Sequence, residues 1–340
     1  MIATGLESAQ SALAWPPCPY RVRGASPDEL SAPLPPSVLG AVAYGEPPCS
    51  PSDPRRVHVP LPLLHGRRGG EIWESLLPVV HGREGIVGYA ENGTVMLLSL
   101  SLPEADLGNT EGAAERLYRE LLRFTATKGY PHLLRVWNFL GQINQGDGDD
   151  ERYRRFCVGR HRALSAASNF ERRLSAATAI GTAGGGLSVM VLAGRRPGRQ
   201  IENPRQLSAY RYPRTYGERS PSFARATYVP WADGSQLLVS GTASIVGHAT
   251  AHAGDAQAQL RQTAANLQAL LAQPSLARRG FLPEQYTLYL RHEEDLITLL
   301  PLLDRMFGNA PLLVLKGDIC RRELMLEVEA IYRLPAIRRP

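Results

Sequence analysis

The 340-residue sequence predicts an α+β protein built from two tandem domains of the same design. The length exceeds that of a typical single domain. The order β-β-α-β-α-β can be traced twice along the chain, and the apolar and charged fractions, 44% and 21%, are those of an ordinary globular protein. Each unit is expected to form a mixed sheet with two helices packed on one face. The bare faces of the two sheets would then pack together around an inter-domain cleft.

Composition and pattern divide the chain into three segments. Residues 1–55 form a proline-rich N-terminal extension, with stretches such as "WPPCPYR" and "APLPPS" that are expected to wrap the surface in partly extended form. The first domain is predicted to cover residues 56–200 and the second domain residues 201–340.

The first unit begins with a hairpin, "GIVGYAENGTVMLLSLSL", that turns at Asn92-Gly93, a strong turn signal between two strand-like runs. A helix is predicted from about Thr110 to Lys128, because apolar residues recur every three or four positions and Asn109 is a suitable N-cap. The strand "LLRVWNFL", a helix around "ERYRRFCVGRHRAL" and the strand "LSVMVLAG" complete the unit.

The second unit repeats this order. Its hairpin, "ATYVPWADGSQLLVSG", turns at Asp233-Gly234. A helix capped by Asp255 is predicted over 256–273, and the strand "QYTLYLR" follows it. A second helix is expected over 293–307, and strands near 312–315 and 324–331 finish the unit.

The last predicted strand, "ELMLEVEAIY", places carboxylates on one face. Since side chains alternate along a strand, its apolar residues would face a core: Leu324, Leu326, Val328 and Ala330. Glu323, Glu327 and Glu329 would point the other way. A solvated outer face is the ordinary explanation, but the duplication favours a face that looks into the inter-domain cleft.

Charge and cysteine usage exclude several classes of function. The net charge of +6 comes almost entirely from scattered arginines, so we expect no nucleic-acid partner and favour a small anionic ligand. The four cysteines form no CxxC pattern, and "GHATAH" lacks the glutamate of a zinc protease motif, so no metal site is expected. With no signal peptide and no 18-residue apolar stretch, we expect a cytoplasmic protein without a membrane partner.

Several longer segments resemble one known family, the chorismatases, which are built on a duplicated RidA/YjgF-like fold. The second half, with "LLVSGTASI" and the terminal "LEVEAIY", is similar to RidA/YjgF proteins in general. The segments that resemble chorismatases are "RVWNFLGQIN", "ERYRRFCVGR", "NPRQLSAYRYP", "YGERSPSFARA", "SGTASIVGH" and "GDICRRELMLEVE". They are spread over residues 130–330, and the first 55 residues contribute little.

The resemblance implies a reaction and its catalytic residue. Chorismatases release pyruvate from chorismate without cofactor or metal, and the position that matches their catalytic glutamate is Glu327. This residue would protonate the methylene carbon of the enolpyruvyl ether. Cys320 stands at the position typical of the members that form 3-hydroxybenzoate. Ala243 replaces the glycine that is commoner in producers of 3-hydroxybenzoate alone, which implies a mixture of 3- and 4-hydroxybenzoate.

The chemistry sets requirements on the other residues. Protonation of carbon needs an acid with a raised pKa, since a free glutamate with a pKa of about 4.3 is ionised at neutral pH. Two substrate carboxylates need fixed cations, and arginine suits bidentate contact. Arg160 is our first choice, with Arg135 also inside the resembling segments. The other predicted contacts with substrate are Arg205, Tyr210, Tyr212, Tyr216, Arg225, Gly241, Ala243, Lys316, Cys320 and Glu329.

Three functions therefore stay open. The first is conversion of chorismate to 3-hydroxybenzoate, with or without 4-hydroxybenzoate. The second is a hydrolytic chorismatase that gives a dihydroxycyclohexadiene carboxylate, and the third is a non-enzymatic RidA-like protein that binds a small acid. RidA-like folds usually assemble as trimers, but the duplication could satisfy that need within one chain, so a monomer and a trimer are both expected possibilities.

Overall fold

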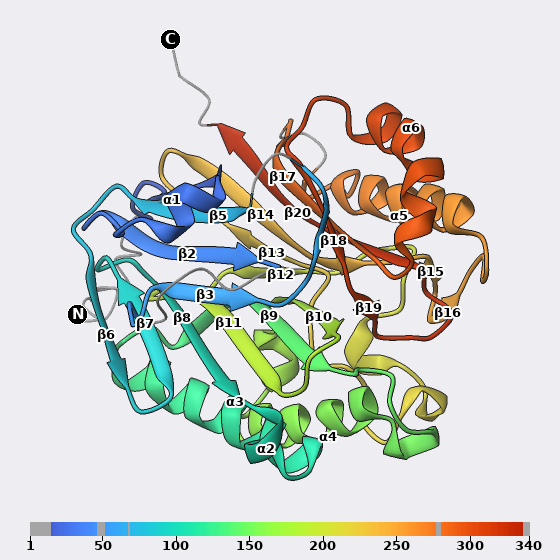
Figure 1. Ribbon diagram of the computed structural model, residues 1–340, viewed down its shortest axis with the longest axis horizontal. Coiled ribbons are helices and arrows are strands. Elements are labelled where there is room, and N and C mark those ends of the chain that lie inside the picture. The colour runs from blue at the N-terminus through green and yellow to red at the C-terminus, as the bar shows by residue number, and fades with distance from the viewer. Residues whose placement is uncertain (1–14, 46–51, 67–68, 277–279, 336–340) are drawn as a thin grey trace, which may run out of the picture.

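Two large sheets facing each other form the centre of the molecule, and a smaller sheet lies beside them (Figure 1). The computed structural model describes residues 15–45, 52–66, 69–276 and 280–335. Helices α3 (Thr110–Thr127) and α4 (Arg152–Leu164) cover the outer side of one large sheet. Helices α5 (Ala256–Leu271) and α6 (Leu296–Phe307) cover the outer side of the other. The predicted α+β class with two tandem units is confirmed.

The first large sheet has the strand order β19-β10-β9-β11-β8-β7-β6. Six of these strands come from the first half of the chain: β6 (Val80–Glu84), β7 (Val87–Glu91), β8 (Val95–Leu102), β9 (His132–Gly141), β10 (Ala176–Thr182) and β11 (Leu187–Gly194). A short helix, α2 (Glu104–Leu107), precedes α3. The side chain of Asn109 accepts a hydrogen bond from the Gly112 amide, so the predicted N-cap is confirmed.

The second large sheet has the order β12-β13-β14-β20-β17-β18-β4. Six of its strands come from the second half: β12 (Arg199–Ile201), β13 (Ala226–Val229), β14 (Gly234–Thr242), β17 (Leu282–Leu290), β18 (Leu312–Lys316) and β20 (Leu326–Pro335). A two-stranded ribbon follows β14 and consists of β15 (Ile245–Val246) and β16 (Ala249–Thr250). Asp255 caps α5 as predicted, accepting from the Ala258 amide.

The two sheets repeat one topology strand for strand. The run β10-β9-β11-β8-β7-β6 in the first sheet corresponds to β18-β17-β20-β14-β13-β12 in the second. Sequence patterns identified most of this repeat but missed β6, β10 and β12. Strand β10 was missed because "AATAIGT" is a run of small residues without clear alternation.

Each half of the chain also contributes an edge strand to the large sheet of the other half. Strand β4 (Leu63–His65) pairs with β18 at the edge of the second sheet. Strand β19 (Asp318–Ile319) pairs with β10 at the edge of the first sheet. This exchange fixes the two sheets against each other and brings the segment before β20 next to the first domain.

The expectation that residues up to 55 wrap the surface is wrong for the described part of that segment. Residues 20–75 contribute a four-stranded sheet of order β1-β5-β2-β3, with Tyr20 and Trp73 fully buried. Its elements are β1 (Tyr20–Ala25), α1 (Pro27–Ser31), β2 (Val38–Tyr44), β3 (Arg56–Val59) and β5 (Gly70–Ser75). The boundary predicted at residue 55 therefore falls inside this sheet, and the boundary predicted at residue 200 falls within β12.

Of the four apolar clusters among the described residues, one lies within the N-terminal sheet and three hold the two large sheets and their helices together. Of these three, one lies under α3 and α4, and a second lies under α5 and α6. The third lies between the sheets and joins residues of all three, among them Trp73, Trp137 and Leu238. The predicted bare faces thus meet in a shared core, and the site described next lies at one end of it, where polar side chains replace apolar ones.

Candidate active site

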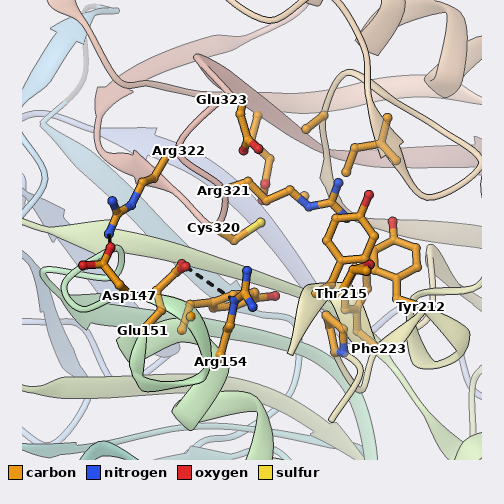
Figure 2. Close-up of a pocket in the computed structure, with 18 of the residues that line it drawn as sticks. Asp147, Glu151, Arg154, Tyr212, Thr215, Phe223, Cys320, Arg321, Arg322 and Glu323 are labelled. Atoms are coloured by element: carbon orange, nitrogen blue, oxygen red, sulfur yellow. Dashed lines mark ion pairs between the residues drawn. The ribbon is translucent and has the colours of Figure 1, made fainter. Parts of the chain in front are cut away.

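A cavity of about 360 Å³ lies where β14, β20, the N-terminal part of α4 and the loop before β13 meet (Figure 2). Elements of both tandem units line it, as the predicted inter-domain cleft requires. Seven sequence-predicted site residues are among those that line it: Tyr212, Tyr216, Arg225, Gly241, Ala243, Cys320 and Glu327.

Glu327 is the second residue of β20 and reaches this cavity because of strand alternation. Its neighbours Leu326 and Val328 point into the cluster under α5 and α6, so Glu327 points the other way. The residue is 5% exposed, and no described residue forms a hydrogen bond or ion pair with its carboxyl group. Burial raises the pKa of this carboxyl from 4.5 to about 8, and nearby Glu329 adds to the rise, while Arg135 and Arg225 oppose it. Glu327 is therefore mostly protonated at neutral pH.

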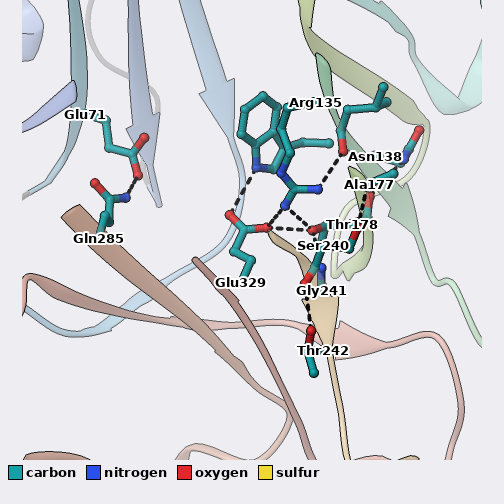
Figure 3. A network of polar contacts seen from close by, with 12 residues as sticks. Glu71, Arg135, Asn138, Ala177, Thr178, Ser240, Gly241, Thr242, Gln285 and Glu329 are labelled. Atoms are coloured by element: carbon teal, nitrogen blue, oxygen red, sulfur yellow. Dashed lines mark hydrogen bonds and ion pairs between the residues drawn. The ribbon is translucent and has the colours of Figure 1, made fainter. Parts of the chain in front are cut away.

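Glu329 faces the first sheet and is fully occupied there (Figure 3). Its Oε2 lies 2.5 Å from Nη2 of Arg135 and accepts a 2.6 Å hydrogen bond from Thr178 Oγ1. Its Oε1 accepts a hydrogen bond of 3.0 Å from the indole of Trp137. These partners come from β9 and β10, so Glu329 joins the two sheets. Its predicted contact with substrate is not supported, because both oxygens already have partners and it does not line the cavity.

The absence of a side chain at Gly241 leaves room for the carboxyl group of Glu327. The residue lies in a bulge of β14, where the pairing register with β20 shifts between Val239 and Thr242. Its amide donates a hydrogen bond of 3.0 Å to Thr178 Oγ1, the hydroxyl that also binds Glu329. A Cβ atom on Gly241 would lie 1.7 Å from Oε1 of Glu327. Only glycine therefore permits the observed position of the carboxyl group.

Two arginines of the cavity have no carboxylate partner within the described ranges. Arg225 donates hydrogen bonds of 2.7 Å to the Tyr212 hydroxyl and 2.8 Å to the Leu207 carbonyl. Arg321 donates to the His248 carbonyl at 2.9 Å, and its guanidinium lies 3.9 Å from the ring centre of Tyr216. Each also carries a buried N–H nitrogen that lacks a partner. Because an unpaired buried cation is costly, these groups are suited to bind an anion.

Apart from Glu323, which is exposed at the rim, the other charged groups that line the cavity are paired with each other. Arg154 lies 3.6 Å from Glu151, and the exposed Arg322 lies 3.2 Å from Asp147, as the dashed lines of Figure 2 show in part. The cavity thus offers one protonated carboxyl, two unpaired guanidinium groups and the hydroxyls of its tyrosines. This set can bind an organic anion and give it a proton.

Comparisons with known proteins agree with this arrangement. A family model described as the N-terminal part of FkbO/Hyg5-like chorismatases matches residues 71–193. A 3-hydroxybenzoate synthase of Streptomyces hygroscopicus is 35% identical over 275 residues, which are 77% of this chain and 80% of that protein. The chain belongs to the chorismatase family.

Further relatives support the same assignment. A chorismatase of Streptomyces rapamycinicus is 36% identical over 274 residues, covering 77% of this chain and 81% of the relative. The crystal structure of a chorismatase superposes with a TM-score of 0.81 at 31% identity, covering 92% of this chain and 98% of that one. The match covers most of the chain, so its fold is that of a chorismatase. No helix of the described residues is long and apolar enough to cross a membrane.

Cys320 and Ala243 form part of the cavity wall in this chorismatase. Burial raises the pKa of the Cys320 thiol to about 12, so the sulfur is a neutral thiol at physiological pH. Only the thiolate is an effective nucleophile. The position of Cys320 is therefore that of a wall residue rather than of a nucleophile.

Besides Glu329, four predicted substrate contacts lie outside this cavity. Lys316 forms an exposed ion pair with Glu293 at 2.9 Å, and Arg205 donates to the Asn266 side chain at 3.2 Å. Tyr210 contacts the guanidinium of its neighbour Arg211. Arg160, our first choice, lines a different cavity on the opposite part of α4. Sequence position alone could not distinguish these residues from those whose side chains turn toward Glu327.

The sequence analysis missed residues that the fold brings to the cavity. Tyr153 and Arg154 reach it from the first turn of α4, and Arg321 reaches it from the loop before β20. The available signal for Arg321 was its place directly after Cys320 in the segment "GDICRRELMLEVE".

We expect Gly241→Ala to lower turnover about tenfold or more, because the new methyl group must displace the Glu327 carboxyl and misplacement by about 1 Å can cost that much. The measurement is kcat/KM for pyruvate release from chorismate. Gly184→Ala is the matched control, since a Cβ there meets nothing within 4 Å. Equal activity of Gly241→Ala and the wild type would show that the carboxyl position is not set by this glycine.

Proposed function

We propose that this chorismatase converts chorismate to 3-hydroxybenzoate and pyruvate, with 4-hydroxybenzoate as a second product, and that Glu327 is its general acid. The observation that carries the proposal is a buried glutamate, with a pKa that burial raises to about 8, in a cavity with two arginines that lack carboxylate partners among the described residues. The name of the relative that is 35% identical, 3-hydroxybenzoate synthase, supports the choice of product.

The two unpaired arginines suit the two carboxylates of chorismate. Arg225 and Arg321 come from different loops, and both contact the ring of Tyr212, while Arg321 also lies over Tyr216. A guanidinium group binds a carboxylate through two parallel hydrogen bonds, and the tyrosine rings hold the guanidinium planes in place. We assign one substrate carboxylate to each arginine, with the enolpyruvyl methylene directed at Glu327.

The reaction begins with transfer of the Glu327 proton to the methylene carbon. The electron pair of the carbon–carbon double bond forms the new C–H bond, and positive charge develops on the adjacent carbon and the ether oxygen. The carboxylate left on Glu327 faces this charge and stabilises it. The Glu329–Arg135 pair behind it stays fixed throughout, because its oxygens are bonded to the first sheet.

The atoms of the two products account for all atoms of chorismate without added water. The bond between the ring and the ether oxygen breaks, and its electron pair remains with oxygen as the keto group of pyruvate. Loss of a ring proton makes the ring aromatic. If the ring hydroxyl oxygen bonds to the carbon that pyruvate leaves and its bond to its original carbon then breaks, the product is 3-hydroxybenzoate. If the oxygen stays on its own carbon and that carbon loses its proton, the product is 4-hydroxybenzoate.

The wall residues decide whether water takes part. Attack of water on the cation would give pyruvate and a dihydroxycyclohexadiene carboxylate, so an aromatic product requires that water be kept away from it. Cys320 and Ala243 supply apolar surface close to Glu327 in the same cavity. We assign them the role of excluding water and holding the ring in place.

Incubation of the purified protein with chorismate tests the proposal. Pyruvate is measured with a coupled assay, and the ring product is identified by chromatography. Release of pyruvate together with 3-hydroxybenzoate is the expected result. A dihydroxycyclohexadiene carboxylate would instead identify the hydrolytic reaction, and binding of chorismate without pyruvate release would identify a binding protein.

We expect Cys320→Ala to lower the share of hydroxybenzoate and to shift part of the flux to the hydrolytic product. The substitution opens space for about one sulfur atom beside the intermediate, and the nearby polar groups of the cavity can hold a water there. Cys157→Ala is the matched control, since that cysteine is buried under α3 and α4 and does not line the cavity. An unchanged product ratio in Cys320→Ala would show that Cys320 only packs in the cavity wall and does not select the product.

A further inference from the structure

A second cavity, of about 410 Å³, lies beside the C-terminal half of α4. No residue lines both this cavity and the one that holds Glu327. The segment before and within β13 separates them, because Phe223 and Arg225 line the first cavity whereas Ser222 and Thr227 line the second. The second cavity is therefore a distinct space in the molecule.

The decisive feature of this cavity is the side chain of Arg160. The residue is only 5% exposed, yet its guanidinium forms no ion pair and no hydrogen bond with any described residue. Its one specific contact is with the ring of Tyr118, whose centre lies 5.1 Å from the guanidinium carbon. A cation–π contact leaves the N–H groups unsatisfied. A buried cation without a partner is costly, so a ligand that supplies the partner binds strongly.

The surroundings of Arg160 also favour an anion. Ser222 is 1% exposed, and its hydroxyl has no hydrogen-bond partner among the described residues, which leaves a second buried donor in the same cavity. Arg172 and Arg173 lie at its exposed edge, and no aspartate or glutamate is among the described residues that line it. Burial and the charge of Arg173 lower the pKa of His132, which lines the cavity too.

The remaining wall of this cavity is apolar, so it favours a ligand whose uncharged part is hydrophobic. Leu122, Leu133, Leu164, Phe170 and Leu174 line the space around the cationic end. A volume of about 410 Å³ exceeds the need of a bare inorganic anion and falls in the usual range for small organic ligands. One buried guanidinium with an apolar chamber fits a carboxylate attached to a hydrophobic ring.

We propose that this cavity is a second ligand site that binds a small aromatic monocarboxylate, with the carboxylate on Arg160 and Ser222 and the ring among the apolar residues. The hydroxybenzoate released in the proposed reaction belongs to this class, and only that choice of natural ligand rests on the proposed function. The site itself does not depend on Glu327 or on turnover.

Calorimetric titration with benzoate tests the proposal on the full-length protein. The wild type and the Arg321→Met variant are expected to share one benzoate site, and Arg160→Met is expected to lose it, with affinity at least about tenfold weaker. Ser222→Ala should weaken the same site to a smaller extent. Since methionine removes an unpaired buried charge, the thermal midpoint of ligand-free Arg160→Met should equal or exceed that of the wild type.

Two further measurements test the proposal: the activity of Arg160→Met and the binding of inorganic phosphate. Arg160→Met should keep pyruvate release from chorismate within about twofold of the wild type, because Arg160 does not line the cavity of Glu327. Inorganic phosphate should bind at least about tenfold more weakly than benzoate, because it leaves the apolar wall uncovered. The proposal is wrong if benzoate binds Arg160→Met as it binds the wild type, if phosphate binds better than benzoate, or if Arg160→Met loses turnover.

Discussion

Glu327→Gln is expected to lower pyruvate release from chorismate by at least about a hundredfold, the usual range for loss of a general acid. Glutamine keeps the size and the planar shape of the side chain but has no acidic proton to give. Chorismate should still bind, because the arginines of the cavity are unchanged. The measurements are kcat by the coupled pyruvate assay and Kd by calorimetry.

Glu323→Gln is the matched control for this variant. Glu323 also lines the cavity, but it is exposed at the rim and lies in the loop before β20, contrary to its expected place on the strand. Its variant should retain activity within about threefold of the wild type. Full activity of Glu327→Gln would transfer the acid role to another group, and Tyr153 would then be the residue to test.

The pH profile provides an independent check of the same assignment. A general acid works only in its protonated form, and burial holds the pKa of Glu327 at about 8. We therefore expect kcat/KM to be constant at neutral pH and to fall with rising pH above about 8, by tenfold per unit. In Glu327→Gln this descending limb should be absent. A limb that persists in the variant would have to come from a different group.

The raised pKa of Glu327 also predicts how the stability of the fold changes with pH. This prediction distinguishes a loss of activity through unfolding from a loss of the catalytic acid. The folded pKa of about 8 exceeds the unfolded value of 4.5, so this group stabilises the fold below pH 4.5 relative to higher pH, and that contribution is lost as pH rises to about 8. Glutamine does not ionise, so this loss of stability with rising pH is absent from Glu327→Gln. Its thermal midpoint at pH 8 should equal or exceed that of the wild type, which excludes unfolding as the cause of lost activity.

Arg321→Met is expected to have the second large effect, a fall in kcat/KM of about 30- to 1,000-fold, which corresponds to about 2–4 kcal/mol for a buried carboxylate left unpaired. The guanidinium lies against Tyr216 and has no carboxylate partner among the described residues, so its charge is available to the substrate. Methionine keeps much of the apolar stem. The loss should be recovered only in part by Arg321→Lys, because lysine cannot make the two parallel hydrogen bonds.

The neighbouring Arg322 provides the control. It lies beside Arg321 in the sequence, but it is exposed, pairs with Asp147 and donates to the Asn144 carbonyl. Arg322→Met should change kcat/KM by less than about threefold, since exposed ion pairs contribute little. If both variants behave alike, the cavity attracts chorismate through its general positive charge, and the assignment of one carboxylate to Arg321 fails.

Local patterns in the sequence were sufficient for most of the repeated elements and for the direction of the Glu327 side chain. Asn109 and Asp255 cap the helices that they were predicted to cap, because an N-cap depends on residues within one turn. Alternation in β20 directs Glu327 away from the helices, because side-chain direction in a strand follows from sequence parity alone. Leu324 was expected to face one core together with Leu326 and Val328; it is buried, but in the core between the sheets, since it precedes the strand.

The tertiary structure decided which of many similar residues form the site. Arg160 and Arg321 are equally plausible cations in the sequence, but one faces a second cavity and the other stacks on Tyr216 beside Glu327. Glu327 and Glu329 point to the same side of β20, yet only Glu329 meets Arg135 and becomes an ion pair. The sequence by itself predicted most of the repeated elements and the side of β20 on which Glu327 lies, because these depend on residues close together in the chain, whereas the choice of Glu327 as the acid came from the family resemblance and stays a prediction. The exchange of β4 and β19, the burial that raises the pKa of Glu327 and the choice among the arginines depend on residues more than a hundred positions apart, which come together only in the folded chain.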